Sequence, residues 1–474
     1  MKEKGEKTIT VIGAGLSGLY TASKLCENGY SVNILEKNHI VGGLSASIPE
    51  KGYQIDIGPH YMTLKKESKI TDEIIELVGK DELITINNIE KSYLSYYQQK
   101  ILYSFPTIMD AVFASGLKSL VSSTISILKK KSSALYDNNA SASNYLKACF
   151  GDYLFRVWCE PYLIQNFGTL DLPLEYVKNR FRPITIKKIL EKLVNKNKKN
   201  SDEEIKKTSE IYIDCYFKSG IGSLVNLLEK QIKEDNGNII LNANITSIDH
   251  DKKSITYKKN NQQVTLDTDI IVYATSPKII SNWFQNIKKD KNDVKKTHFN
   301  SIMTFLFIDT KKLFDGWLMS IFDTKIPFFR LSQQNFLSDG VGPKGKTLLT
   351  AEIRLDENDE LWTKNDEEIK TLVEEHLKKM SIIKNHHIEG FKIIKFPNLY
   401  PKFNPVKKYS NSTNLELMKN TKNEYILGTV EQDTGRFVTA ESKINDDHVP
   451  STGGIYNAIS NSKKIIKNIL EDDD

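Results

Sequence analysis

The chain has 474 residues, of which 39% are hydrophobic and 27% charged, so it is long enough for two globular domains. Its 66 basic and 60 acidic side chains leave a formal net charge of only +6, which does not indicate nucleic-acid binding. No stretch reaches the roughly 18 apolar residues of a membrane-spanning helix, and the nearest candidate, Ala111 to Leu128, is interrupted by Lys118. We therefore expect no nucleic-acid partner and no transmembrane segment, while a peripheral membrane contact and the oligomeric state stay open.

The cysteine pattern and the first residues bear on the cellular compartment. Cys26, Cys149, Cys159 and Cys215 form no Cys-x-x-Cys pair, so neither a disulfide framework nor a metal site is expected. The short, charged segment Met1–Lys7 contains no hydrophobic signal region. Both features favour a cytoplasmic protein.

The N-terminal residues have the pattern of a strand–helix–strand unit. ThrIleThrValIle at 8–12 is typical of a fully buried strand, and Leu19–Asn28 predicts a helix that ends at Gly29. Ser31–Leu35 predicts the second strand, and Glu36 stands at its end. This order of elements is that of a dinucleotide-binding βαβ unit.

The turn between the first strand and the helix carries three glycines. GlyAlaGlyLeuSerGly places Gly13, Gly15 and Gly18 in G-x-G-x-x-G spacing. Gly13 permits the tight turn, Gly15 lets the backbone approach a pyrophosphate, and Gly18 lets the helix pack closely on the strand. The helix N-terminus offers N–H groups to the phosphates. Glu36 can accept hydrogen bonds from both ribose hydroxyls, which favours NAD or FAD over NADP.

A second glycine pair, Gly42-Gly43, follows shortly after Glu36. GluLysAsnHisIleValGlyGlyLeuSer at 36–45 resembles the extended FAD fingerprint of the flavin amine oxidase superfamily, which includes amine oxidases, protoporphyrinogen oxidases, phytoene desaturases and UDP-galactopyranose mutases. A second turn without side chains lets the backbone close on the far side of the pyrophosphate. Ile40 departs from the pattern, because these families often carry Arg there. The resemblance implies cofactor contacts from Gly13, Gly15, Leu16, Ser17, Gly18, Glu36, Lys37, Gly42, Gly43 and Leu44.

TyrGlnIleAspIleGlyProHis at 53–60 resembles a segment of protoporphyrinogen oxidase-like and mutase-like proteins that passes close to the isoalloxazine ring. The resemblance implies that Gly58 allows close approach to the ring and that Pro59 stiffens the turn. His60 is the first candidate catalytic residue. A histidine that only stacks or hydrogen-bonds is the equal alternative, since the flavin itself performs the redox chemistry.

The middle of the chain resembles the substrate-binding domain of protoporphyrinogen oxidase-like proteins. Residues 144–183 predict helices that carry Trp158, Tyr162 and Arg180. From about residue 286 to 422 we expect strands alternating with charged helices. Most of the aromatic residues are expected in the core.

Three further segments carry site predictions. Arg330, within PhePheArgLeuSer at 328–332, is the second candidate catalytic residue if it faces the substrate cavity, and an exposed structural salt bridge is the alternative. Residues 237–248 predict two strands, and the superfamily residue that matches Ile245 gives backbone hydrogen bonds to adenine. Residues 267–277 resemble the strand that returns to the dinucleotide-binding domain.

The C-terminal region predicts a second contribution to the same cofactor site. AsnGluTyrIleLeuGlyThrVal at 423–430 predicts a strand followed by Gly428, although the acidic residue familiar after this glycine is absent. Residues 451–466 resemble the closing FAD motif, in which Gly454 and Ile455 begin an amphipathic helix that faces the flavin ribityl chain and pyrophosphate. Glycine sites so far apart along the chain imply that distant segments build one cofactor site.

Together these patterns predict an α/β fold, in which a Rossmann-type FAD-binding domain is interleaved with an α+β substrate-binding domain. We expect the discontinuous FAD-binding domain to comprise residues 1–95, 215–285 and 423–474. The substrate-binding domain is expected to comprise residues 96–214 and 286–422.

The resemblance implies an FAD-dependent oxidoreductase of the amine oxidase/protoporphyrinogen oxidase-like type, which transfers hydride from a small organic substrate to flavin N5. Non-covalent FAD is expected, because no cysteine follows Cys215 and the covalent tether of the superfamily is C-terminal. One alternative is a nucleotide-sugar mutase of the UDP-galactopyranose mutase type, in which Arg180 and Arg330 would clamp a diphosphate. A second alternative is a non-catalytic FAD-binding protein.

Overall fold

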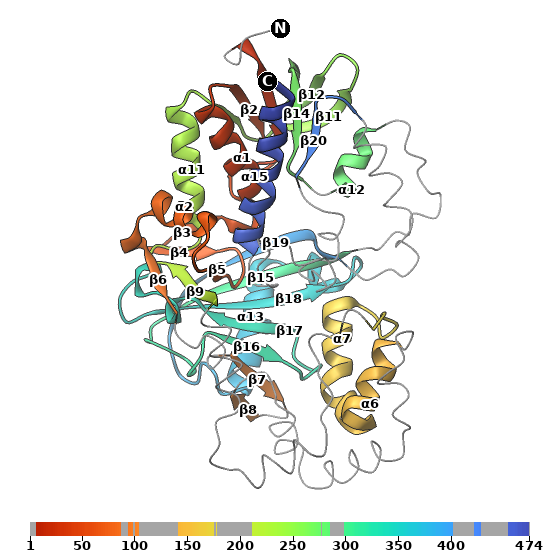
Figure 1. Ribbon diagram of the computed structural model, residues 1–474. Coiled ribbons are helices and arrows are strands. Elements are labelled where there is room, and N and C mark those ends of the chain that lie inside the picture. The colour runs from red at the N-terminus through yellow and green to blue at the C-terminus, as the bar shows by residue number, and fades with distance from the viewer. Residues whose placement is uncertain are drawn as a thin grey trace.

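The fold was obtained as a computed structural model. It describes residues 6–86, 93–97, 100–103, 141–174, 177, 211–275, 277–284, 298–401, 421–427 and 454–473. Figure 1 shows an upper part built on a parallel sheet and a lower part built on a larger sheet, with a pair of helices beside the larger sheet.

The upper part is organised by a five-stranded parallel sheet with the order β10-β2-β1-β14-β20. The strands are β1 (Thr8–Ile12), β2 (Ser31–Leu35), β10 (Asn238–Ile240), β14 (Ile270–Tyr273) and β20 (Glu424–Ile426). Strand β1 lies at the centre, and its residues from Ile9 to Ile12 are all buried, as expected of a central parallel strand covered on both faces. The sheet therefore unites three segments that are far apart in the sequence.

Helices cover one face of this sheet, and a smaller sheet covers the other (Figure 1). The helices are α1 (Leu16–Glu27), α11 (Gly222–Glu234) and α15 (Gly454–Asp473). They pack on Ile9 and Val11 of β1, while Ile12 and Leu35 point to the opposite face. That face packs against an antiparallel sheet of β11 (Asn244–Asp249), β12 (Ser254–Lys259) and β13 (Gln262–Asp267). The result is a three-layered unit.

The lower part is organised by a seven-stranded, mostly antiparallel sheet with the order β19-β15-β18-β17-β16-β7-β8. The strands are β7 (Tyr93–Tyr97), β8 (Lys100–Tyr103), β15 (His298–Ile308), β16 (Leu318–Ile321), β17 (Phe328–Gln333), β18 (Thr347–Leu355) and β19 (Ile388–Pro401). Among the described strand pairs of this sheet, only β16 and β7 run parallel. Strand β7 comes from the N-terminal part of the chain, so it ties that part to the larger sheet.

The two faces of the seven-stranded sheet meet different neighbours. On one face, Ile302 and Leu306 pack with helix α13 (Asp366–Lys379), which a capping box begins at Asn365. On the other face, Met303 and Phe305 pack with residues of β4 and the segment that follows it. The alternation along β15 therefore separates a helix-covered face from a face directed at the upper part.

Short elements join the two parts. They are β3 (Ser47–Glu50), β4 (Tyr53–Asp56), β5 (Met62–Lys65), β6 (Leu83–Thr85), β9 (Tyr212–Phe217) and α2 (Lys69–Val78). The helical pair beside the larger sheet comprises α6 (Ala142–Leu154), a π-helical segment (Phe155–Cys159) and α7 (Glu160–Phe167). The other elements are α12 (Pro277–Ile280) and the 3₁₀ turns Gly43–Ser45, Lys80–Glu82, Ser281–Trp283, Gln334–Phe336, Asp339–Val341 and Glu360–Thr363.

The predicted α/β fold is confirmed, with two differences in detail. Helix α1 begins at Leu16 rather than Leu19, because Gly15 already serves as its N-cap. The expected alternation of strands and helices from 286 to 422 is wrong for the described residues there, where strands predominate and α13 is the one α-helix. The many charged residues of this region suggested several helices, but its described strands β15 to β19 pair with one another as antiparallel strands. Within the described ranges, no helix has the length and apolar character needed to cross a membrane.

Candidate functional site

The first glycine turn packs closely against other backbone atoms at Gly13 and Gly18 but is open at Gly15. Gly13 has φ of +106°, and a Cβ atom there would lie 2.6 Å from the carbonyl oxygen of Ala274. A Cβ atom at Gly18 would lie 2.0 Å from the carbonyl oxygen of Gly13. A Cβ atom at Gly15 would have nothing within 4 Å. Gly13 and Gly18 are therefore required by the protein itself, whereas Gly15 faces space for a ligand.

The second glycine turn lies directly beside the first. Gly15 and Gly42 form an isolated parallel bridge, and the Gly42 N–H donates to the Ala14 carbonyl oxygen at 2.7 Å. Gly42 has φ of +100°, a conformation that glycine adopts readily. A Cβ atom at Gly43 would lie 3.5 Å from the Cα atom of Gly15. The two turns thus form one backbone surface with almost no side chains.

Glu36, the acid predicted for ribose binding, lies beside this surface and is bonded to the first glycine turn. Glu36 is 8% exposed, and its Oε2 accepts a hydrogen bond from the Ala14 N–H at 2.8 Å. Its Oε1 accepts from the backbone N–H and the side-chain amide of Asn38, each at 2.8 Å. A carboxylate has about four lone-pair sites and three donors already occupy Glu36, so Glu36 retains acceptor capacity for one ribose hydroxyl.

The start of α1 completes a surface suited to a pyrophosphate. No side chain caps this helix, and its first turn, which begins with Leu16 and Ser17, contains no acidic residue. A helix N-terminus of this kind favours an anion. The residues therefore fit the predicted dinucleotide, since an open glycine backbone, an uncapped helix start and a buried acid stand together.

The remaining predicted cofactor residues lie around this surface. Lys37 is exposed, and Leu44 is 50% exposed although it is apolar. Ile245, on β11, packs beside the Ile12 and Leu35 cluster, so it lies next to the strand end that carries Glu36.

The C-terminal helix reaches the same region from the far end of the chain. Gly454 begins α15, and Ile455 packs against the core beneath α1. The Ser462 hydroxyl donates to the carbonyl oxygen of Ser17 at 3.2 Å. The structure thus brings the helix of the closing motif against α1, while Gly428 and Arg180 lie outside the described residues.

The segment after β4 connects the glycine turns to the larger sheet. The Ile57 N–H donates to the Ala46 carbonyl oxygen at 3.3 Å, just after the second glycine turn. Gly58 has φ of +90°, and a Cβ atom there would lie 3.8 Å from the Cε atom of Met303. The His60 Nε2 atom lies 2.7 Å from the Ile57 carbonyl oxygen, so the ring folds back over the turn.

A small hollow opens between this segment and the larger sheet. Two strands of that sheet, a 3₁₀ turn and the 57–60 segment all contribute to it. Its lining comprises Asp56, Gly58, Pro59, His60, Trp317, Ser332, Gln334, Leu337 and Thr350. The hollow therefore places the candidate histidine opposite residues of β17 and β18.

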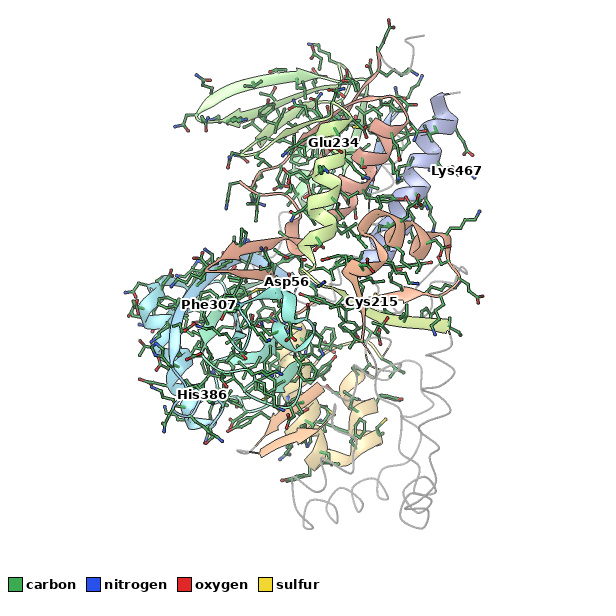
Figure 2. The ribbon with its side chains drawn as sticks, turned by 90° about the vertical axis from the view of Figure 1, so that its left-hand side faces the viewer. Asp56, Cys215, Glu234, Phe307, His386 and Lys467 are labelled. Carbon is green, nitrogen blue, oxygen red and sulfur yellow. The ribbon has the colours of Figure 1, made fainter. Side chains whose placement is uncertain are left out.

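Asp56 is buried at the edge of this hollow, where the upper and lower parts meet (Figure 2). Its carboxylate accepts hydrogen bonds from the hydroxyl groups of Ser47 and Tyr216 and from the Ile221 N–H, the last at 3.2 Å. Burial raises the pKa of Asp56 to about 6, although these hydrogen bonds oppose the shift. Burial, together with the neighbouring Asp56, raises the pKa of Tyr216 well above its ordinary value.

Arg330, the second candidate catalytic residue, lies on the same face of the larger sheet as Ser332 of the hollow. It forms a bidentate pair with Glu352, with Nε–Oε1 of 2.6 Å and Nη2–Oε2 of 2.7 Å. The Arg330 side chain is 12% exposed and that of Glu352 0% exposed, so this ion pair is buried rather than exposed. Arg330 and His60 therefore share one side of the sheet, but the described contacts do not join them.

A second guanidinium lies beside this pair. Arg354 stands 4.2 Å from the ring centroid of Phe329, which Arg330 also approaches at 5.2 Å, and 4.3 Å from that of Tyr400. Such stacking suits the planar, weakly hydrated guanidinium group. The sequence analysis did not single out Arg354 or Glu352, because cross-strand partners cannot be identified before the register is known.

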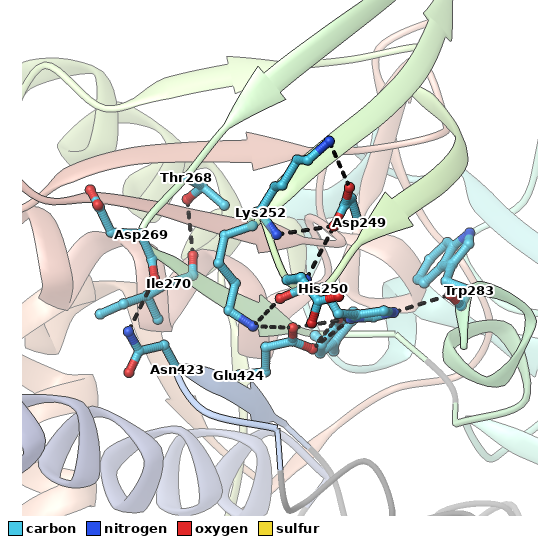
Figure 3. A network of polar contacts seen from close by, with 12 residues as sticks. Asp249, His250, Lys252, Thr268, Asp269, Ile270, Trp283, Asn423 and Glu424 are labelled. Atoms are coloured by element: carbon cyan, nitrogen blue, oxygen red, sulfur yellow. Dashed lines mark hydrogen bonds and ion pairs between the residues drawn. The ribbon is translucent and has the colours of Figure 1, made fainter. Parts of the chain in front are cut away.

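A fourth buried acid, Glu424, lies on the edge strand β20 of the parallel sheet, away from the glycine turns. Figure 3 shows Glu424 beside His250, whose ring also reaches the Trp283 carbonyl oxygen. Lys253 and Tyr273 donate to the same carboxylate at 2.7 and 2.8 Å. Burial would raise the pKa of Glu424, but hydrogen bonds from these groups outweigh burial and lower it. This network is fully paired and holds β20 in the sheet.

Among the described residues, no three His, Cys, Asp or Glu side chains gather into a group that could hold a metal ion. The four cysteines are all buried and unbridged.

Comparison with known sequences bears on the same residues. The sequence profile of the family described as flavin containing amine oxidoreductase matches residues 16–395. The chain is similar to coproporphyrinogen III oxidase of Staphylococcus aureus, with 23% identity over 296 residues, covering 59% of this chain and 62% of the relative. It is also similar to 1-hydroxycarotenoid 3,4-desaturase of a Flavobacterium species, with 36% identity over 91 residues, covering 19% of this chain and 18% of the relative. The aligned part is thus less than two thirds of either relative.

Solved structures resemble the whole chain. Reduced UDP-galactopyranose mutase superposes with a TM-score of 0.75 and 14% identity, covering 98% of this chain and 94% of that one. A protein from Exiguobacterium sp. 255-15, provisionally assigned as a protoporphyrinogen oxidase, superposes with a TM-score of 0.70 and 15% identity, covering 98% and 99%. At these identities the likeness shows the fold.

Proposed function

The chain belongs to the family of flavin-containing amine oxidoreductases, and on that basis we propose that it oxidises a small organic substrate with FAD as its cofactor. The observation that carries the proposal is the continuity between the glycine turns and the hollow. The second turn leads through Ala46 to Ile57, and the segment that follows lines the hollow against the larger sheet. A flavin anchored at the turns would therefore meet a substrate held on that sheet.

The glycine turns, Glu36 and the 57–60 segment each have a place in this proposal. The backbone at Gly15 and Gly42 and the start of α1 would hold the pyrophosphate, and Glu36 would hold the ribose. Gly58, Pro59 and the candidate catalytic His60 would lie beside the ring. Bound FAD supplies the electron-accepting chemistry.

The hollow has room for about one water molecule, so a substrate would lie on the sheet beside it, and the residues of the hollow would shape that surface and exclude water. Trp317 and Leu337 give it an apolar wall, while Ser332 and Thr350 offer hydroxyl groups from adjacent strands. Arg330 is committed to Glu352, so we assign it to shaping this wall rather than to proton transfer. Oxidation in such a site depends on orientation and desolvation of the substrate.

We also propose the domain division expected from the sequence, with residues 1–95, 215–285 and 423–474 binding FAD and residues 96–214 and 286–422 binding substrate. In support, the parallel sheet takes all its strands from the first set, and β15 to β19 come from the second. Strand β7 crosses the boundary at residue 95, so it belongs better with the substrate-binding part. A cytoplasmic location remains part of the proposal.

The substitution Gly15→Val tests the cofactor site without disturbing the fold. Gly15 has φ of −69° and ψ of 173°, which valine adopts, and its Cβ position is open. The variant should therefore fold but lose FAD, because its side chain fills the pyrophosphate space. Purified wild-type protein should be yellow and release its flavin on acid precipitation, as non-covalent binding requires.

Gly29→Asn is a matched control at the other end of α1. Gly29 has φ of +85° with nothing within 4 Å, and asparagine tolerates such a conformation. This variant should keep its FAD. A Gly15→Val protein that purifies with a full complement of flavin would contradict the proposed site.

A nucleotide-sugar mutase remains a second candidate because of one observation. Two guanidinium groups, those of Arg330 and Arg354, lie over the Phe329 ring on the substrate-facing side of the sheet. Cations of this kind could clamp a diphosphate. A mutase would convert a sugar nucleotide only after its flavin has been reduced with dithionite, and would leave the flavin reduced.

A further inference from the structure

The side-chain amide of Gln334 joins the backbone around Asp56 to the larger sheet through two hydrogen bonds. The Gln334 Oε1 atom accepts the Asp56 N–H at 3.0 Å, and its Nε2 donates to the Gln54 carbonyl oxygen at 2.7 Å. One side-chain amide therefore holds the backbone on both sides of Ile55, as a neighbouring strand would. Gln334 lies 278 residues from Asp56 in the sequence, in the turn that follows β17.

The hydrogen bonds around Asp56 form a connected network in which every partner of the carboxylate is a donor. Gln334 Nε2 also donates to the Tyr216 hydroxyl at 3.0 Å, and that hydroxyl donates to Asp56 Oδ2. Ser47 donates to Asp56 Oδ1 and accepts the Gly222 N–H at 2.8 Å. Every partner of the carboxylate is a donor, so the set is complete only when Asp56 is ionised.

We propose that Asp56 is a positioning residue, which acts through Ser47 as well as through Tyr216 and Gln334 to fix the 57–60 segment against the flavin ring. This inference rests on the proposed function, since it needs FAD bound at the glycine turns. Asp56 immediately precedes the segment, and both Asp56 and Gln334 line the hollow that contains His60. The network thus spans the two surfaces between which the reaction would take place.

Protonation of Asp56 gives the network a second arrangement. A neutral carboxyl group must donate one hydrogen bond, so the Tyr216 or the Ser47 hydroxyl must turn away. A turn of Tyr216 alters its bond with Gln334, which holds the backbone at Gln54 and Asp56. A turn of Ser47 alters its bond with the Gly222 N–H, so the rearrangement does not depend on Tyr216 alone. The groups that face the Asp56 carboxylate come from β3, β9 and α11, and among those described only the Tyr216 phenol is titratable. Because burial raises the pKa of Asp56 to about 6, the change falls near neutral pH.

The visible absorption and circular dichroism of bound, oxidised FAD report on this change without any substrate. The oxidised isoalloxazine ring does not itself titrate between pH 5 and 8, so a spectral transition there comes from the protein. In the wild-type holoprotein we expect a transition centred near pH 6. Asp56→Asn should abolish the transition while FAD remains bound.

Tyr216→Phe gives a second test that keeps the carboxylate. It removes a hydrogen bond that favours ionised Asp56, so the transition should move to higher pH. The matched control is Asp214→Asn, two residues earlier on β9, where burial also raises the pKa of the carboxyl group. This control should leave the transition at the wild-type pH.

The possible failures are distinguishable. A wild-type chain that binds no FAD overturns the proposed function and this inference together. A holoprotein whose transition survives Asp56→Asn, or fails to move to higher pH in Tyr216→Phe, overturns the inference alone. If Asp56→Asn prevents folding, the direction of the Tyr216→Phe shift decides the matter.

Discussion

The parallel sheet and the seven-stranded sheet each bury a glutamate next to the proposed site, but they neutralise it differently. Glu36 receives backbone N–H groups from Ala14 and Asn38, close to it in the sequence and in the turn. Glu352 receives the guanidinium of Arg330 from the neighbouring strand and the hydroxyl of Tyr400 at 2.9 Å. Glu36 is therefore held by uncharged groups, whereas Glu352 is held by the positive charge of Arg330.

This difference separates a ligand-binding acid from a structural one. Glu36 accepts hydrogen bonds from uncharged donors only, so it keeps its negative charge and about one acceptor site for a ligand. Glu352 also accepts three hydrogen bonds, but two of them come from the fork of Arg330, which neutralises its charge. We therefore expect changes at Glu352 to act on stability and changes at Glu36 to act on FAD affinity.

The largest effect is expected for Glu352→Gln. The substitution leaves the Arg330 charge buried without its acid, which typically costs about 3–5 kcal/mol of the free energy of unfolding. Urea denaturation followed by circular dichroism would measure the loss. The double variant Arg330→Met with Glu352→Leu should recover most of it, since replacing both charges by apolar groups is often nearly neutral. A single variant as stable as the wild type would show that the pair is not structural.

Glu36→Ala should have the next largest effect, on cofactor affinity. It removes a charged acceptor from the ribose hydroxyls, a loss on the order of 1.5–3 kcal/mol per charge-assisted hydrogen bond. Titration of the apoprotein with FAD would measure the weaker affinity. Because Ala14 and Asn38 lose their acceptor as well, Glu36→Gln is the milder companion variant and should lie between wild type and Glu36→Ala. Unchanged FAD affinity in both would remove Glu36 from the site.

The Glu424 network extends the comparison to an ion pair that titrates. Burial alone would lower the pKa of His250, but hydrogen bonds to Glu424 and the Trp283 carbonyl oxygen outweigh burial and the repulsion of Lys253, and raise it. A raised pKa of a base means that its stabilisation is present below the ordinary value near 6.5 and is lost as pH rises through the folded-state pKa.

The thermal midpoint should therefore fall modestly as pH rises above about 6.5, the ordinary pKa of histidine. His250→Asn should flatten this slope without changing FAD content, because the network lies on the edge of the sheet away from the glycine turns. Scanning calorimetry of both proteins at several pH values would show it. Identical slopes would mean that His250 contributes nothing to the pH dependence.

The smallest structural effect is expected for His60→Ala. The ring lies half-buried in the hollow, where its Nε2 atom is 2.7 Å from the carbonyl oxygen of Ile57. FAD binding should persist while anaerobic reduction by substrate slows. Equal reduction rates would leave His60 as a purely structural residue.

The cofactor half could be predicted because its signals are local. The glycines and Glu36 lie within a few tens of residues, and each has a conformational reason that a sequence displays. The substrate half could not be predicted in the same way. Arg330 faces Glu352 only because a β-bulge shifts the register after Phe328, and without it the side chain would point into the α13-covered core.

The network around Asp56 illustrates the same limit. Asp56 stands inside a segment that the sequence singles out, but its partners Tyr216 and Gln334 are 160 and 278 residues away. No local spacing indicates such contacts. Only the pairing of strands from both halves shows that the acid is buried and what surrounds it.

Anaerobic stopped-flow mixing of the oxidised, FAD-loaded protein with amines, porphyrinogens, polyenes and nucleotide sugars would test the oxidoreductase function most directly. We predict that a substrate from the first three classes bleaches the flavin absorbance in the absence of oxygen. No bleaching by any of them, together with sugar-nucleotide turnover that appears only after dithionite treatment and causes no net flavin oxidation, would contradict the proposal and establish a mutase.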